Sequence, residues 1–327
     1  MMEKIPQPQP YRAKLKLFGE RAERVLRSEY DLIVGELLDN FREYFYEIRP
    51  AEQLQDKESF GDLDFICFPK RTIDELYFQR VLGDKLLEYH RNGHVHSALI
   101  KLASGKQIHA DFIQSKDEND FERKYMYYSK GHASSIIGML AKKNNFKYGT
   151  EGFFRRFRDK RGNWHDILVS ESLDDGLAIM GLDAETFDNI HTIDDIVNFV
   201  VQSPLFDSEY FGSENMARRD RESIKRNPSQ DYIAQKLREK NKAKSVENEN
   251  ELFEKLFPEQ FQRFKKEGER INNETYSPGA INGKKIMEVF KIKPGPEVGK
   301  ILKFISDNYP KAEDLSEEII RVVKDKF

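Results

Sequence analysis

The sequence predicts an α+β protein, because strand-like runs and helical patterns are mixed in its first half and helical patterns dominate afterwards. An apolar, aromatic run at 62–68 precedes Pro69. Two alternating runs at 96–102 and 107–113 are joined by a short glycine-containing loop, a pattern typical of a β-hairpin. We therefore expect a mixed sheet with flanking helices, followed by a mostly helical C-terminal region.

The elements follow one another in the order helix, strand, helix, strand, strand, helices. Apolar positions at helical spacing predict two helices within residues 12–46. Thr72, followed closely by two acidic residues, marks a helix start, and the apolar pattern continues that helix to about His90. Further helices are expected from about residue 118 onward.

The length of 327 residues is enough for about two domains. Residues 201–250 are rich in charge, poor in aliphatic periodicity and interrupted by proline and glycine, which predicts a charged linker or helical arm. Helical patterning returns afterwards. We therefore expect a core at 12–200, the linker or arm at 201–250, and a helical module at 251–327.

Composition excludes a membrane-spanning protein. The longest apolar stretches, such as 196–201, are far shorter than the roughly 20 residues that a bilayer requires. The single cysteine, Cys67, cannot form an internal disulfide, which favours a cytoplasmic location. Charged residues reach 34%, but the 24 phenylalanines and 14 tyrosines supply apolar surface for globular domains.

The net charge of −3 hides a strong local asymmetry. Residues 131–161 carry eight basic and two acidic side chains, and residues 218–244 carry ten and four. Such runs are either solvated helix faces or surfaces that grip a polyanion. On the second interpretation, the basic side chains that would contact a nucleic-acid backbone are Lys142, Lys143, Arg155, Arg156, Arg158 and Arg161.

Three aspartates are the strongest candidates for chemistry. In a strand, side chains two residues apart share a face, so Asp62 and Asp64 would converge and repel each other unless a cation lies between them. Asp111 sits among apolar neighbours in the second arm of the hairpin. If the hairpin lies beside the first strand, the three carboxylates can hold divalent metal. The simpler alternative is that Asp62 caps a turn and Asp64 faces solvent.

Two metal ions about 3.5–4 Å apart can support an in-line phosphoryl displacement, in which one activates the attacking hydroxyl and the other stabilises the leaving pyrophosphate. The stretch from Glu58 to Asp64 resembles the palm motif of the DNA polymerase X family, the polymerase β-like nucleotidyltransferases. His109 to Phe112 is similar to the strand that bears this family's third catalytic aspartate. The resemblance covers about residues 12–200 and implies a palm at about 46–128 and a thumb- or fingers-like helical and hairpin part at about 129–200.

The resemblance implies an activity and its ligands. Asp62, Asp64 and Asp111 would hold two Mg²⁺ ions, with Mn²⁺ as an alternative, and would transfer a nucleoside monophosphate from a nucleoside or deoxynucleoside triphosphate to the 3′-hydroxyl of DNA or RNA. The sequence departs from the family near Glu52–Gln53, where a Gly-Ser pair should grip the triphosphate. The residues expected to bind nucleotide instead are Lys57, Ser59, Gly61, Tyr127 and Tyr128.

A second resemblance covers residues 281–308, which look like the C-terminal helical segment of bacterial CCA-adding enzymes and poly(A) polymerases. It makes nucleotide addition to RNA 3′ ends the alternative to polymerase X-like DNA synthesis. Two further hypotheses stay open: a non-catalytic palm that binds nucleic acid, and nucleotidyl transfer to a protein or small molecule.

Overall fold

The computed structural model describes residues 17–160, 162–246, 248–275, 281–309, 312 and 314–327. Contacts divide this part of the chain into two compact units. The first contains residues 17–156 and 166–262, and the second contains 157–165 and 263–327. Helices and strands are both well represented, which confirms the α+β class.

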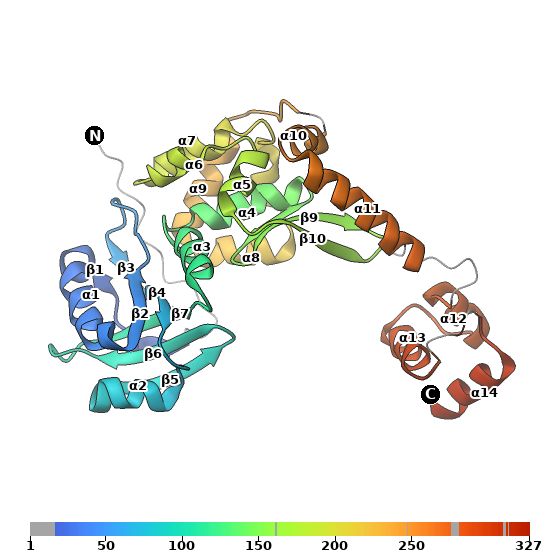
Figure 1. Ribbon diagram of the computed structural model, residues 1–327, viewed down its shortest axis with the longest axis horizontal. Coiled ribbons are helices and arrows are strands. Elements are labelled where there is room, and N and C mark those ends of the chain that lie inside the picture. The colour runs from blue at the N-terminus through green and yellow to red at the C-terminus, as the bar shows by residue number, and fades with distance from the viewer. Residues whose placement is uncertain (1–16, 161, 247, 276–280, 310–311, 313) are drawn as a thin grey trace. The chain divides into compact units, whose positions relative to one another are not determined.

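A five-stranded mixed sheet forms the N-terminal part of the first unit (Figure 1). Its strands are β2 (Phe45–Pro50), β4 (Leu63–Pro69), β5 (Leu86–Asn92), β6 (Val95–Lys101) and β7 (Gln107–Gln114). The spatial order is β2-β4-β7-β6-β5, in which β4 and β7 run parallel and the other neighbours run antiparallel. The hairpin expected at 96–113 is therefore confirmed, and it lies directly beside the strand expected at 62–68.

Helices cover both faces of this sheet. Helices α1 (Arg27–Phe41) and α2 (Glu75–Leu82) pack on one face, where Phe112 contacts Phe41 and Phe78 with ring centroids 4.6 and 5.0 Å apart. Helix α3 (Glu118–Tyr128) packs on the other face through Phe121, against Ile66 and Ile113. Because successive side chains of a strand alternate between faces, the even-numbered positions of β4 and the odd-numbered positions of β7 point toward α3.

The N-terminal segment differs from the expectation of two helices within 12–46. The structure has one long helix there, α1, preceded by a 3₁₀ turn, η1 (Gly19–Arg21). Strand β1 (Val25–Leu26) pairs with β3 (Ser59–Phe60) in a small separate ladder. Gly19 adopts a positive φ of 63°, which an extended helix through this position would not allow. The earliest part of the predicted first helix lies outside the described residues.

The helix predicted from 72 to about 90 is also corrected. Helix α2 ends at Leu82, because Gly83 takes a positive φ of 53° that breaks the helical path. After a 3₁₀ turn, η3 (Gly83–Lys85), the chain becomes the edge strand β5. Leu86 and Tyr89 of that strand pack against the core under α1 and α2, which sequence periodicity alone did not reveal.

The remainder of the first unit is mainly helical. A three-stranded sheet in the order β10-β9-β8 also lies in it, except for residues 157–158 and 164–165 of its strands, which belong to the second unit. The strands are β8 (Phe146–Gly149), β9 (Gly152–Arg158) and β10 (Trp164–Ser170). The helices are α4 (Ala133–Lys143), α5 (Leu173–Ile179), α6 (Ala184–Asp188) and α7 (Ile193–Gln202). The turn after α5 depends on Gly181, whose φ is +67° and whose missing side chain would meet Pro204 at 2.4 Å.

Residues 201–250, predicted as a charged linker or helical arm, contain η4 (Ser208–Phe211), α8 (Arg218–Arg226) and α9 (Pro228–Glu239). Helix α9 buries Ile233, Ala234 and Leu237, and it packs against α7 and η4. Helix α10 (Glu249–Leu256) adds the buried Phe253. This segment is therefore packed into the first unit along one apolar face of α9.

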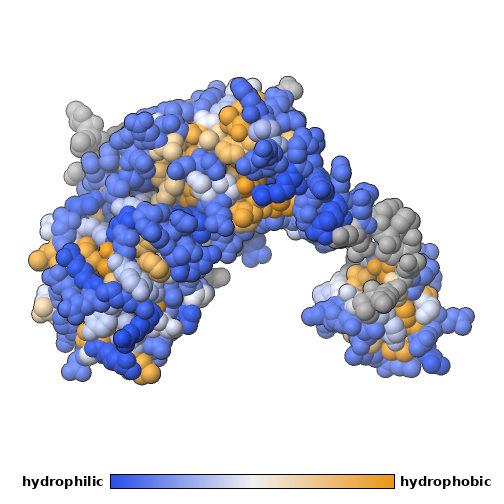
Figure 2. Space-filling view, viewed as in Figure 1, coloured by the Kyte–Doolittle hydropathy of each residue, from blue (hydrophilic) through white to orange (hydrophobic). Residues whose placement is uncertain are grey.

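The second unit has its own core. Helices α12 (Gly283–Phe290), α13 (Pro296–Asn308) and α14 (Glu317–Lys326) bury Ile286, Ile301 and Val323 against one another, and α11 (Pro258–Thr275) contains the boundary between the units. Figure 2 shows apolar side chains among hydrophilic ones on the visible face of this unit. In the part of the chain that the structure describes, no helix combines the length and the apolar character needed to span a bilayer.

Candidate active site

Asp64 and Asp111 lie side by side in the large sheet. Asp64 is the second residue of β4, Asp111 is in the middle of β7, and the two are direct register partners in the parallel ladder. Both side chains are on the α3 face and are half-buried. The backbone of Asp64 is held by the Ala51 N–H, which donates to its carbonyl at 2.8 Å. The structure therefore brings two of the three predicted aspartates together on the sheet.

Asp111 is held by two neighbours that do not appear among the predicted site residues. His109, two positions earlier on the same face of β7, donates from Nε2 to Asp111 Oδ1 at 2.8 Å. The Ser97 hydroxyl, opposite on β6, donates to the same oxygen. Burial lowers the pKa of the His109 imidazole. The hydrogen bond to Asp111 and the charges of Asp111, Asp62 and Asp64 outweigh burial, so that the pKa is raised. The other carboxylate oxygen, Oδ2, has no hydrogen-bond partner within the described residues.

The surroundings of Asp64 disfavour the charged form of its carboxyl. Burial, then the charges of Asp62 and Asp111, raise the pKa of its carboxyl to about 8, and the charge of Lys57 offsets only part of this. Asp62 lies just before β4 and is exposed. Across the described residues, neither the Asp64 nor the Asp62 carboxylate receives a side-chain or backbone hydrogen bond. The carboxyl groups of Asp62, Asp64 and Asp111 therefore lie close together where β4 begins beside β7.

The three carboxylates are not arranged as a complete set of metal ligands. Within the described ranges, no group of three or more His, Cys, Asp or Glu side chains is arranged to hold a metal ion. The donor chemistry nevertheless fits a hard divalent cation, since it consists of carboxylates, and two of these, Asp62 and Asp64, accept no hydrogen bond within the described residues. Burial first, and then the charges of Asp62 and Asp111, raise the pKa of Asp64, and a bound cation would offset both effects.

Two tyrosines border the aspartates. Burial, then Tyr127 and the charges of Asp64 and Asp111, raise the pKa of Tyr128 to about 12. Burial and the charge of Asp64 likewise raise the pKa of Tyr30, on α1, to about 12. Tyr127, predicted with Tyr128 to bind nucleotide, instead packs against Tyr148 with ring centroids 5.9 Å apart. Tyr128 therefore borders the aspartates, and the Tyr127 ring packs against both Tyr128, with centroids 5.4 Å apart, and Tyr148.

Lys57 lies close enough to Asp62 and Asp64 for their charges to act on it. Its Nζ donates to Gln53 Oε1 at 3.1 Å and lies 4.8 Å from the centroid of the Phe60 ring. Burial lowers the pKa of Lys57, and the charges of Asp62 and Asp64 counteract this. His132, at the start of α4, faces the same ammonium group, and burial together with the Lys57 charge lowers its pKa to about 4.

Ser59 and Gly61 are positioned by an arginine that is absent from the predicted set. Arg24 donates from Nε to the Ser59 hydroxyl at 3.0 Å and from Nη2 to its carbonyl at 2.8 Å. A side chain added at Gly61 would lie 3.2 Å from Arg24 Nη1, so this glycine lets the guanidinium approach the chain just before Asp62. Because β1 and β3 pair, Arg24 is brought next to the motif from a distance of 35 positions, which no local pattern signals.

The loops on either side of this site are joined by hydrogen bonds. The Glu52 N–H donates to the Ser129 hydroxyl at 3.1 Å, and the Lys130 N–H donates to the Glu52 carbonyl at 2.8 Å. Lys130 Nζ also pairs with Glu52 at 2.7 Å. Gly131 has a positive φ of 61°, and a side chain there would lie 3.0 Å from Leu54. The Glu52–Gln53 segment is therefore held against the start of α4 by these contacts.

The predicted nucleic-acid contacts are mostly engaged within the protein. Arg155 is 5% exposed and pairs with Glu249 at 2.9 Å, which is at odds with a role on the surface. Arg156 pairs with Asp166 at 2.7 Å, and Lys142 pairs with Asp220 at 2.8 Å. Lys143 donates to the Asn215 carbonyl. In the second unit, Arg158 stacks over Trp164, and Arg161 lies outside the described residues.

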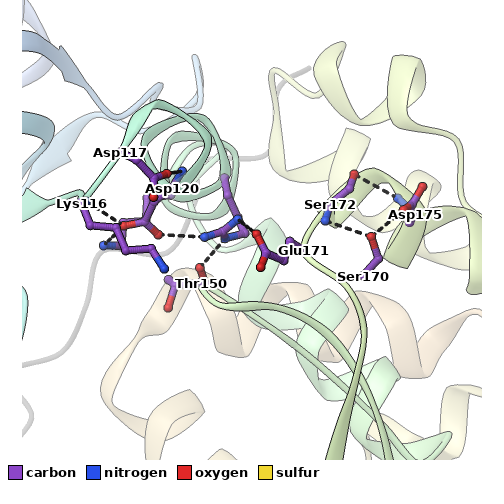
Figure 3. A network of polar contacts seen from close by, with 10 residues as sticks. Lys116, Asp117, Asp120, Thr150, Ser170, Glu171, Ser172 and Asp175 are labelled. Carbon is purple, nitrogen blue, oxygen red and sulfur yellow. Dashed lines mark hydrogen bonds and ion pairs between the residues drawn. The ribbon is translucent and has the colours of Figure 1, made fainter. Parts of the chain in front are cut away.

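A buried ionic network anchors α3 beside the site (Figure 3). The Asp120 carboxylate pairs with Arg123 at 3.0 Å and with Lys124 at 2.8 Å, and it accepts from the Lys116 N–H at 3.1 Å. Arg123 Nε also donates to the Thr150 carbonyl at 2.9 Å, and the Glu171 carboxylate lies 3.6 Å from the Arg123 guanidinium. The network ties α3 to the β8–β9 turn and to the chain after β10.

The fold and the site together define an α+β protein with a carboxylate cluster at the point where two parallel strands adjoin. Neither the protein-family models nor the curated protein sequences include a match to this chain.

Proposed function

We propose that this protein is a metal-dependent nucleotidyltransferase. The observation that carries the proposal is the pairing of Asp64 and Asp111 on adjacent parallel strands, with Asp62 close by. Asp64 has no hydrogen-bond donor within the described residues, and the charge of Lys57 offsets only part of its repulsion by the other two carboxylates. Structural carboxylates are normally paired with donors or cations, as Asp120 is in the same unit. Carboxylates kept together without such partners are typical of a site that binds a cation during its work.

Asp62, Asp64 and Asp111 are the residues that would hold divalent metal, Mg²⁺ first and Mn²⁺ as a substitute. When bound, two such ions would neutralise the phosphates and polarise the attacking and leaving oxygens. Asp111 uses Oδ1 for His109 and Ser97, which fixes the carboxylate and leaves Oδ2 for the reaction. Oδ2 would accept the hydrogen of the acceptor hydroxyl and orient it toward the α-phosphorus.

The phosphates of the donor nucleotide need cationic partners, because the Gly-Ser pair of the polymerase X family is absent. Lys57 and Arg24 fit this role, since both lie beside the Asp62–Asp64 segment on the side where β3 leads into β4. Lys57 is half-buried, so its charge acts through less water than a surface lysine would. Ser59 and Gly61 contribute by placing Arg24. Tyr128 borders the same space and would contact the nucleotide there.

The acceptor that the sequence favours is the 3′-hydroxyl of a polynucleotide, in a polymerase X-like DNA synthesis. Addition to an RNA 3′ end of the CCA or poly(A) type is the alternative that the 281–308 segment supports. A partner nucleic acid would make the reaction sensitive to salt, because phosphate contacts release counterions.

The test is to incubate the full chain with labelled nucleoside and deoxynucleoside triphosphates, Mg²⁺ or Mn²⁺, and a panel of acceptors: primed DNA, single-stranded DNA and transfer RNA. We expect metal-dependent labelling of one class of acceptor, and template dependence then separates DNA synthesis from tail addition. No labelling of any acceptor in either metal would contradict the proposal and would favour a non-catalytic palm that binds nucleic acid.

A further inference from the structure

A cavity of about 520 Å³ opens in the first unit between α3 and the helices α5 and α6. None of the three aspartates of the candidate active site lines it. Its volume falls in the range of about 300–1,000 Å³ that is usual for small-molecule sites. The cavity is therefore a second candidate binding site, separate from the carboxylate cluster on β4 and β7.

One wall of the cavity is apolar and aromatic. Tyr125 and Met126 contribute from α3, and Leu173 and Phe187 contribute from the opposite helices. Phe187 is fixed in place, since it is 1% exposed and packs edge-on against Phe199 at 5.8 Å. Such a wall suits an alkyl chain, and aromatic faces also attract alkylammonium groups.

The two cations that line the cavity are both engaged by the protein. Lys130 pairs with Glu52 at 2.7 Å and donates to the Asp188 carbonyl at 2.7 Å. Arg123 is occupied by Asp120 and the Thr150 carbonyl. Neither side chain is therefore available to neutralise the further acidic groups around the cavity.

Two acidic side chains that line the cavity have no partner within the described residues. Asp174, in the first turn of α5, and Asp188, the last residue of α6, both line the cavity, and across the described residues neither carboxylate has an ion pair or hydrogen bond. Burial, then the charge of Asp188 and that of Asp175, raise the pKa of Asp174.

We propose that this cavity binds a small organic polycation, an aliphatic amine with at least two ammonium groups, with its charges at Asp174 and Asp188 and its methylene chain along the aromatic wall. The combination of an apolar wall and two uncompensated carboxylates distinguishes it from a site for an inorganic ion, which would present oxygen ligands on all sides. The proposal stands independently of nucleotidyl transfer, because it requires neither nucleotide nor the aspartates on β4 and β7.

Calorimetric titration of the full chain with spermidine, without nucleotide, tests this site. We expect one saturable site, and at least a tenfold weaker affinity in the D174N/D188N double variant, since both ammonium partners lose their charge. Glu185→Gln is the matched control: it removes a carboxylate from the same helix, α6, but from a residue outside the cavity lining, and should change the affinity less than twofold.

Three results would overturn the proposal. An equal loss of spermidine affinity in E185Q and in the double variant would indicate general attraction to an acidic surface. Equally tight binding of the uncharged 1,8-octanediol would indicate a purely apolar cavity, and complete displacement of spermidine by Mg²⁺ at equal charge concentration would indicate an inorganic cation site. Thermal unfolding of each variant shows that the comparison is made on folded protein. E185Q should match the wild type, and D174N/D188N should be at least as stable, because the raised pKa of Asp174 means that its charged form does not stabilise the fold.

Discussion

The variant Asp64→Asn should lose nucleotidyl transfer by at least about a thousandfold and yet unfold at a higher temperature than the wild type, by a few degrees. Activity falls because an amide cannot replace a carboxylate as a metal ligand between Asp62 and Asp111. Stability rises because the raised pKa of Asp64 means that its charged form destabilises the folded state. Paired measurements of labelled nucleotide transfer and of thermal unfolding check both halves of the expectation.

The pH dependence of this stabilisation follows from the sign of the pKa shift. A carboxyl whose pKa rises to about 8 on folding disfavours the native state above that pH, and the penalty disappears as the pH falls toward the ordinary range near 4. The advantage of D64N should therefore be largest above pH 8 and vanish near pH 4. Asp84→Asn, at an exposed position in η3, is the control and should change neither property. A less stable D64N variant would contradict the account, because it would show that Asp64 has a structural partner.

The opposite behaviour is expected at Asp120, where Asp120→Asn should lower the free energy of unfolding by about 3–5 kcal/mol. The substitution leaves Arg123 and Lys124, which are 9% and 5% exposed, buried without their shared carboxylate. Urea denaturation measures the loss. Glu171→Gln removes the most exposed partner of Arg123, 3.6 Å away, and should cost less than about 0.5 kcal/mol.

Acid should reproduce part of this effect. Burial opposes the charge on Asp120, but the bonds to Lys124 and to the Lys116 N–H, with the Arg123 charge, outweigh it and lower the pKa of the carboxyl. The stability that the network contributes is therefore present above the ordinary aspartate pKa and is lost as the pH falls below it. Wild-type protein should show this loss and D120N should not. Equal acid sensitivity in the two proteins would indicate that other carboxylates dominate.

The sequence was sufficient to predict the centre of the site. The apolar, aromatic run at 62–68 and the alternation at 107–113 predict both strands. The sequence left open whether the hairpin lies beside the first strand, and the pairing of β4 with β7 makes Asp64 and Asp111 neighbours. The edge strand β5 was missed because Leu86 and Leu87 extend the helical pattern of α2, and only the positive φ of Gly83 separates the two elements. Periodicity cannot detect a break that depends on one glycine's backbone conformation.

The surroundings of the site were less predictable, since they depend on long-range packing. Arg24 reaches Ser59 only because β1 pairs with β3, and His132 faces Lys57 only because the loop before α4 is bonded to Glu52. Arg155 belongs to a basic run in the sequence, but α10 brings Glu249 to it and buries the pair. A count of charges along the chain cannot tell which cations are already engaged by distant carboxylates.

The central claim is that Asp62, Asp64 and Asp111 hold divalent metal for phosphoryl transfer. Electron paramagnetic resonance of Mn²⁺ added to the full chain with a non-hydrolysable nucleoside triphosphate analogue tests it most directly. We predict protein-bound Mn²⁺ in the wild type and in Asp84→Asn, and its loss in Asp64→Asn and Asp111→Asn. Bound Mn²⁺ that is equal in all four proteins, or absent from the wild type, would contradict the claim.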